Sequence, residues 1–331
     1  MVTRSGNFAA IRNLLRNSRR ALPFPTRRNL AIDLRAQGAL PLQALYESRF
    51  EPCVIRVPIA ATRWWGPTGF RYGAGSTHPY VLAVEEYAGG RNPSYEGSAL
   101  SRYWTAWQPG SLAAALGLSG PDIHPKLASA PPVHSILPWF GSDCLMTADL
   151  ASYKPRWQAY YLEGYSLTRS NGPQSIEFGK QRLAHIIKTY EFLKSRGVWS
   201  TPPSGLSFFE QFPVGDILES DGRVALMMAD GQHRLAAMSA LGMQEANVIV
   251  AVRHGRGPMV VRRSDVDTWP LVRMGVMTPG QALEVFDRIF RAEQPAGCVW
   301  PDALSTTTSM DSNGGDGGIR TLDTDYLRIT V

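Results

Sequence analysis

The chain has 331 residues, of which 44% are hydrophobic, 10% aromatic and 19% charged. This composition supplies enough apolar side chains for one large domain or two ordinary ones, and it excludes a wholly disordered chain. No apolar run approaches the roughly 18 residues that cross a bilayer, and the N-terminus lacks the continuous apolar stretch of a secretory signal. We therefore expect neither a transmembrane helix nor a cleaved signal peptide.

Three cysteines, Cys53, Cys144 and Cys298, are widely spaced and odd in number. They form no Cys-x-x-Cys pair of the kind that binds structural zinc, and a disulfide framework needs an even set. Neither kind of site is expected, and a reducing cytoplasm is the predicted location.

The positive charge is concentrated at the N-terminus. Residues 1–35 contain eight Arg and one Asp, a net charge of +7, whereas the other 296 residues sum to −1. Phe8, Ile11, Leu14 and Leu15 recur at helical spacing. One interpretation of this basic amphipathic arm is a solvated leader. The alternative is that residues 1–20 contact an anionic membrane surface, which would place the protein at the periphery of the inner membrane. Because the body is close to neutral, nucleic acid is not an expected partner.

Residues 36–154 form an N-terminal region rich in Gly, Pro and aromatic side chains. Pro52–Ile59 has the apolar character and length of a strand, and Tyr80–Tyr87 fits either a strand or a short helix. Ser98–Trp107 is predicted to be a helix, because its apolar residues share one face. The aromatic side chains favour core anchors of a loop-rich region, with a sugar-stacking surface as the alternative.

Residues 155–295 contain both predicted helices and predicted strands, and the expected fold class is α+β. Apolar residues recur at helical spacing over Gly179–Arg196, and Gly197 closes this helix. A buried strand at Val224–Ala229 leads through a polar turn into a short helix at Leu235–Leu241. The other predicted elements are strands at Phe212–Leu218 and Asn247–Arg253, a turn at Asp221–Gly222, and a helix that begins at Pro279 after the cap Thr278. Residues 296–331 are rich in Ser, Thr, Gly and Asp and are expected to be a disordered tail.

The polar turn Asp230–Gly231–Gln232–His233–Arg234 lies where a strand ends and a helix begins. N–H groups at a helix start favour anions, and Gly231 lets the backbone approach a ligand. Arg234 can pair bidentately with phosphate, and His233 can donate a hydrogen bond or exchange a proton. Asp230 can orient His233, bind a metal ion or accept a proton. We therefore expect Gly231, Gln232, His233 and Arg234 to bind phosphate in a solvent-accessible cleft.

A purely structural role is the alternative for the same turn. Asp230 and Arg234 would then pair and cap it, and His233 would be a buried histidine with its hydrogen bonds satisfied.

The turn, with Ala237 and Leu241–Gly242 after it and a helix ending in Lys194–Val198 before it, resembles the signature of the ParB/sulfiredoxin superfamily. The resemblance covers roughly residues 170–253. It implies a ParB/sulfiredoxin-like domain over residues 155–295, behind the loop-rich, aromatic-rich N-terminal region. Sulfiredoxins have a cysteine at the position of Gln232, so peroxiredoxin repair is disfavoured. ParB proteins typically have two arginines in the turn and a helix-turn-helix domain after it, so ParB-like DNA binding is a distant alternative.

The form Asp-Gly-x-His-Arg is most similar to the free serine kinases of this superfamily. They use a nucleotide, Mg²⁺ and a glutamate just before the first amphipathic helix, a place that Glu177 occupies here; Glu210 and Glu219 are the alternatives. The resemblance implies a phosphotransferase in which Asp230, His233 and Glu177 are catalytic. Asp230 would bind Mg²⁺, the cofactor would be ATP, ADP or CTP, and the acceptor a small hydroxylated or sugar-type molecule.

The whole chain also resembles uncharacterised bacterial proteins of cell-surface polysaccharide loci. The shared features are an aromatic segment at Tyr95–Ser98, the polar turn, and Val266–Pro270 before a terminal helix. This resemblance favours a second function, a non-catalytic nucleotide-binding module that regulates envelope polysaccharide metabolism. A carboxylate near Arg234 would favour the enzyme, and its absence would favour the binding module.

Overall fold

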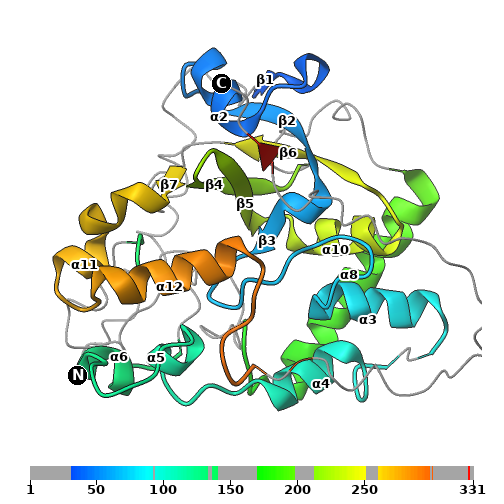
Figure 1. Cartoon of the computed structure of the whole chain (residues 1–331). Helices are drawn as coiled ribbons and strands as arrows, with labels where there is room; N and C mark the ends of the chain where they lie inside the picture. Colours follow the sequence, from blue (N-terminus) through cyan, green and yellow to red (C-terminus); the bar gives the residue numbers. More distant parts are fainter. Residues whose placement is uncertain are drawn as a thin grey trace, which may run out of the picture.

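The structure is a computed structural model that describes residues 31–91, 94–132, 136–140, 170–197, 212–250, 260–298 and 300, with the backbone of 327 and 328. These residues form a mixed sheet with helices against it (Figure 1). The expected α+β class is confirmed at this level. Residues 1–30 of the basic arm lie outside the described residues, whereas Ile32–Asp33 at its end form a strand of the sheet.

The sheet has the strand order β1-β2-β6-β4-β5-β3, with β7 beside β4 and β8 beside β5. The strands are β1 (Ile32–Asp33), β2 (Cys53–Pro58), β3 (Thr62–Trp64), β4 (Val214–Ser220), β5 (Arg223–Asp230), β6 (Glu245–Val250), β7 (Val260–Arg262) and β8 (Leu327–Arg328). β2 pairs antiparallel with β6, and β3 pairs parallel with β5. Residues 36–154 therefore supply strands to the same sheet as residues 155–295.

Helices cover both faces of the sheet. One core cluster includes side chains of α3 (Pro79–Ala88), α4 (Ala99–Ala106), α8 (Ile176–Arg196) and α10 (Gln232–Ala240). The other includes side chains of α5 (Leu112–Ala115), α6 (Pro125–Ser129), α11 (Pro270–Arg273) and α12 (Pro279–Phe290). On β5, Val224, Leu226 and Met228 face the first cluster, whereas Ala225 and Met227 face the second. Successive strand residues point to opposite faces, so β5 is buried on both sides.

Shorter elements complete the described chain. The helix α2 (Pro41–Glu47) packs beside β2, and 3₁₀ helices span Arg35–Gln37, Ile59–Ala61 and Arg263–Thr268. None of the described helices combines the length and apolar character needed to cross a membrane.

Most predicted elements are confirmed where they are described, and one ambiguity is resolved. Tyr80–Tyr87 belongs to the helix α3, whose first residue is Pro79. His78 caps this helix, because its Nδ1 accepts a hydrogen bond from the Tyr80 N–H over 3.0 Å. An apolar run this short has no clear period, so the cap and the proline decide its conformation.

The packed chain continues beyond residue 295, into the segment whose composition predicts disorder. Cys298 and Trp300 are buried, and the Trp300 indole donates a hydrogen bond to the Thr77 carbonyl over 3.0 Å. Further along, β8 pairs with the start of β5. Part of this segment therefore belongs to the fold.

Candidate phosphate-binding site

The connection between β5 and α10 is a single residue, Gly231. Its φ is +77°, and a Cβ at this position would lie 2.6 Å from Cα of Pro213. Only glycine meets both conditions without strain, since L-residues with side chains disfavour positive φ. Gly231 therefore turns the chain sharply enough to start α10 directly after Asp230, the last residue of β5.

The N-terminus of α10 has no side-chain cap among the described residues. Side chains cap α3, α4, α8 and α12. Oδ1 of Asp230 instead accepts a hydrogen bond from the N–H of Gly231, one residue before the helix, over 2.6 Å. The N–H groups of the first helical turn have no intrahelical acceptor, so an anion can take the place of the cap.

Arg182 of α8 reaches this turn from the neighbouring helix. Its guanidinium lies over the ring of Phe178 at 5.0 Å, and its Nη1 lies 3.0 Å from Nε2 of His233. Arginine can only donate, so His233 accepts at Nε2 and carries its proton on Nδ1. Within the described part of the chain, Nε of Arg182 is buried without a hydrogen-bond partner. A phosphate oxygen would supply the acceptor that this N–H lacks.

His185 lies one turn after Arg182 and completes the α8 side of the site. Its ring centroid is 4.6 Å from that of His233, and the His233 ring in turn lies 5.5 Å from that of Tyr80. The pKa of His185 is lowered from 6.5 by burial first, and then by the positive charges of Arg182 and Lys188. The charges of Arg182 and Lys188 make the surroundings of this ring positive, which favours an anionic ligand.

Arg234 and Asp230 lie on the α10 side of the site. Burial lowers the pKa of the Arg234 guanidinium, and the nearby Asp230 carboxylate opposes this shift. Asp230 is exposed at the end of β5. The charged groups at the turn therefore include Arg182, Arg234 and the Asp230 carboxylate. This carboxylate interacts electrostatically with Arg234.

Gln232 has a different role from the one expected for its side chain. Its Oε1 accepts a hydrogen bond from the Trp64 indole over 3.1 Å, and its Nε2 donates to the Met228 carbonyl over 3.3 Å. Both polar ends thus bind protein. Gln232 can contribute to anion binding through its backbone N–H.

No contact described for residues 170–197 and 212–250 joins Glu177 or Glu219 to the turn. Glu177 is exposed in the first turn of α8, where it contributes to raising the pKa of Lys180. Glu219 lies near the opposite end of the β4–β5 hairpin from Asp230, and its Oε1 accepts from the Gly222 N–H over 3.2 Å. Glu210 lies outside the described residues.

Sequence reasoning missed four residues that meet at the site: Trp64, Tyr80, Arg182 and His185. The sequence contains a signal for Arg182 and His185, because residues three apart in a predicted helix lie on the same side of it. The other two come from β3 and α3, and nothing in their local sequence relates them to the turn.

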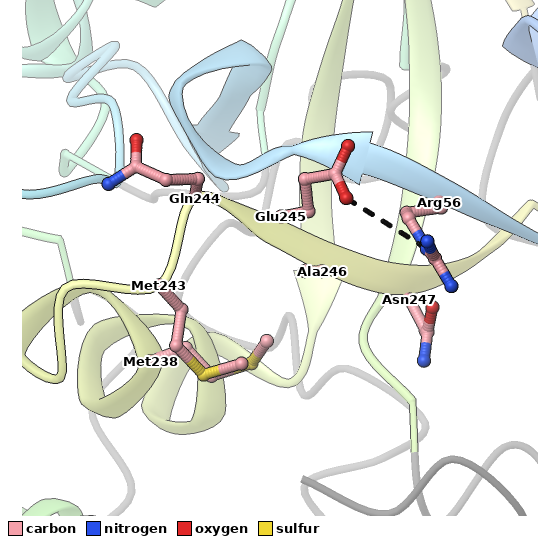
Figure 2. Close-up of a pocket in the computed structure, with 7 residues that line it drawn as sticks. All are labelled: Arg56, Met238, Met243, Gln244, Glu245, Ala246 and Asn247. Atoms are coloured by element: carbon pink, nitrogen blue, oxygen red, sulfur yellow. Dashed lines mark ion pairs between the residues drawn. The ribbon is translucent and has the colours of Figure 1, made fainter.

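One cavity of the described residues lies away from the turn. It has a volume of about 520 Å³ and lies at the far end of α10, where its lining includes Met238, Met243 and Asn247 (Figure 2). Figure 2 also shows the ion pair between Arg56 and Glu245, whose Nε and Oε2 are 3.9 Å apart. The turn itself has partly exposed side chains at its surface, with Gly231 buried beneath them.

A metal ion would need the ligand's own oxygens here. No group of three or more His, Cys, Asp or Glu side chains within the described ranges could hold one. Mg²⁺ usually keeps several waters and takes one or two carboxylates together with substrate phosphates. Asp230 fits as one such ligand for a nucleotide-bound Mg²⁺.

Comparisons of the chain with protein-family models, with curated proteins and with solved structures found no match.

Proposed function

We propose that this chain binds the phosphates of a nucleotide at the uncapped N-terminus of α10. The observation that carries the proposal is the Arg182–His233 contact of 3.0 Å, which brings a second arginine from α8 to a turn that already holds Arg234. The buried Nε of Arg182, which has no partner among the described residues, adds a donor for a phosphate oxygen. Two planar guanidinium groups and a helix N-terminus without a side-chain cap among the described residues suit a polyphosphate.

We propose further that the bound nucleotide is ATP, ADP or CTP with Mg²⁺, and that ATP or CTP donates its terminal phosphoryl group to a small hydroxylated or sugar-type acceptor. The exposed Asp230 carboxylate beside Arg234 supports this step. Asp230 would accept the proton of the acceptor hydroxyl while the oxygen of that hydroxyl forms a bond to the terminal phosphorus. The bond from that phosphorus to the leaving nucleoside diphosphate breaks, and Mg²⁺ and Arg234 offset the charge on the phosphate oxygens.

The family assignment is part of the proposal. The described order of helix α8, strands β4 and β5, polar turn, short helix α10 and strand β6 supports a ParB/sulfiredoxin-like domain. A non-catalytic nucleotide-binding module is the second candidate, and the exposed position of Glu177 favours it. That module would bind the same phosphates without transferring them.

A thermal-shift panel with ATP, ADP, CTP and GTP, each with and without Mg²⁺, tests the proposal. A ligand at 100 times its Kd stabilises a protein by about 2.7 kcal/mol, which is readily detected. Arg234→Lys and Arg182→Lys keep the charge but lose the planar fork, so both should weaken binding. Arg273→Lys, in the exposed part of α11 in the other helix layer, is the matched control. A folded wild-type protein that no nucleotide stabilises would overturn the proposal.

A further inference from the structure

We infer that His185 takes up a proton when a phosphate binds at the α10 turn, so the site binds its anion more tightly as the pH falls. This inference rests on the proposed phosphate site. It concerns the regulation of that site by pH, and it adds a residue of α8 to the groups that respond to the ligand.

The contact between Arg182 and His233 keeps the second histidine neutral. Nε2 of His233 lies 3.0 Å from Nη1 of Arg182 and must accept this hydrogen bond. A protonated His233 would have no acceptor to offer and would repel the guanidinium. The proton is therefore expected on His185, whose ring is 4.6 Å from that of His233 and which is exposed at the surface of α8.

The surroundings of His185 are positive before the ligand arrives. From its own helix, Arg182 and Lys188 act on the ring, and both lower its pKa after the larger effect of burial. From α10, His233 faces it, and from α3 Tyr80 meets the other histidine at 5.5 Å. Asp230 is the carboxylate described at this turn, and it interacts with Arg234. Before the ligand arrives, these surroundings therefore favour the neutral form of the His185 ring.

An anion reverses this balance. Its negative charge offsets Arg182 and Lys188, so the protonated form of His185 becomes more favourable and the pKa rises in the complex. Wherever the pH lies between the lower pKa of the free protein and the higher pKa of the complex, binding takes up a proton. Affinity then increases as the pH falls, by at most about tenfold per pH unit for one proton. Above the pKa of the complex, affinity is independent of this group.

Two measurements on the full chain test the inference. The first is calorimetric titration with ATP at pH 6.5 in two buffers of different ionisation enthalpy, which counts the protons exchanged. Because the terminal phosphate of ATP also titrates near this pH, the uptake by His185 is the difference between the wild type and His185→Gln. The second is an NMR titration of the histidine ring resonances with sodium sulfate, a tetrahedral dianion that does not titrate between pH 5.5 and 8. We expect proton uptake with ATP and an upward shift of the His185 pKa with either anion. His185→Gln should remove the uptake, whereas His124→Asn, at the cap of α6, should keep it.

The outcomes separate the two proposals. Binding of ATP without proton uptake, or with a proton that appears on His233, overturns the inference and leaves the phosphate site intact. Uptake that is unchanged in His185→Gln overturns it as well. If neither ATP nor sulfate binds at any pH, the proposed function fails and the inference fails with it.

Discussion

The Trp64 indole N–H donates to Oε1 of Gln232 over 3.1 Å and so ties the strand β3 to the first turn of α10. Trp64 is 2% exposed, and its ring packs against Phe70, His78, Tyr80 and Tyr103. The start of the helix is therefore held by a buried aromatic cluster rather than by a capping side chain of its own.

Removing the acceptor of this hydrogen bond should destabilise the fold. In Gln232→Leu the buried Trp64 N–H loses its partner, and a buried donor without an acceptor costs about 1–3 kcal/mol. Gln244→Leu, at an exposed glutamine just after α10, is the control and is expected to lose less. Urea unfolding followed by tryptophan fluorescence measures both. Equal stability of Gln232→Leu and the wild type would show that the contact contributes nothing to stability.

Gly231 and Gly222 provide a matched pair of substitutions. Both have positive φ, +77° and +73°, but a Cβ at Gly231 would meet Pro213 at 2.6 Å whereas one at Gly222 meets nothing within 4 Å. Gly222→Ala should cost about 1–2 kcal/mol from backbone strain alone. Gly231→Ala adds overpacking, so a further loss of about 1–3 kcal/mol is expected in denaturant unfolding. Similar losses for the two variants would contradict the close approach of Pro213.

The buried His78 should make stability depend on pH. Burial holds its pKa well below the usual 6.5, so the folded state keeps the ring neutral while the unfolded state protonates it. The unfolded state then binds more protons, and stability falls as the pH drops below about 6.5, by up to about 1.4 kcal/mol per pH unit. Above this pH the contribution is fully present.

Two histidine caps allow this pH dependence to be assigned. His78→Asn keeps an acceptor for the Tyr80 N–H but removes the titrating ring, so the decline of stability between pH 7.5 and 5.5 should become shallower. The ring packing lost with His78 lowers stability at every pH. His124 caps α6 in the same way, with Nδ1 3.1 Å from the Lys126 N–H, but it is partly exposed. Parallel slopes for the wild type and His78→Asn would exclude His78 as the source, and His124→Asn controls for the replacement of a histidine cap.

Asp230 and Glu177 should respond differently to loss of their charge. Asp230→Asn retains an oxygen for the Gly231 N–H, so the turn should fold and bind nucleotide without Mg²⁺. If Asp230 is the general base, phosphoryl transfer should fall by about 10²–10⁴-fold. Glu177→Gln, in the exposed first turn of α8, should change transfer less than twofold. Consumption of ATP in the presence of serine, glycerol or glucose measures both, and an inactive wild type that binds ATP would favour the non-catalytic module.

The sequence alone determined the elements whose signals are local. The apolar spacing of α8 predicts its buried face, with Leu183, Ile186 and Tyr190 all buried. Thr278 and Gln281 form the capping box that starts α12, and the uninterrupted apolar run of β5 predicts burial on both of its faces. In each case the residues that specify the element lie within one or two turns, or within one strand, of each other.

Only the tertiary structure decided which of these elements meet. Cys53 of β2 lies opposite Val250 of β6, 197 residues along the chain, and no local period relates the two strands. The same holds for the site, because Arg182 reaches His233 only through the packing of α8 on α10, and Gln232 meets Trp64 only because β3 pairs with β5. The turn itself can be predicted from its own residues. The charged residues around it are brought there by the packing of apolar faces on separate helices and strands. Because the hydrophobic effect is non-directional, this packing leaves no signal in the sequence at the polar positions that it brings together.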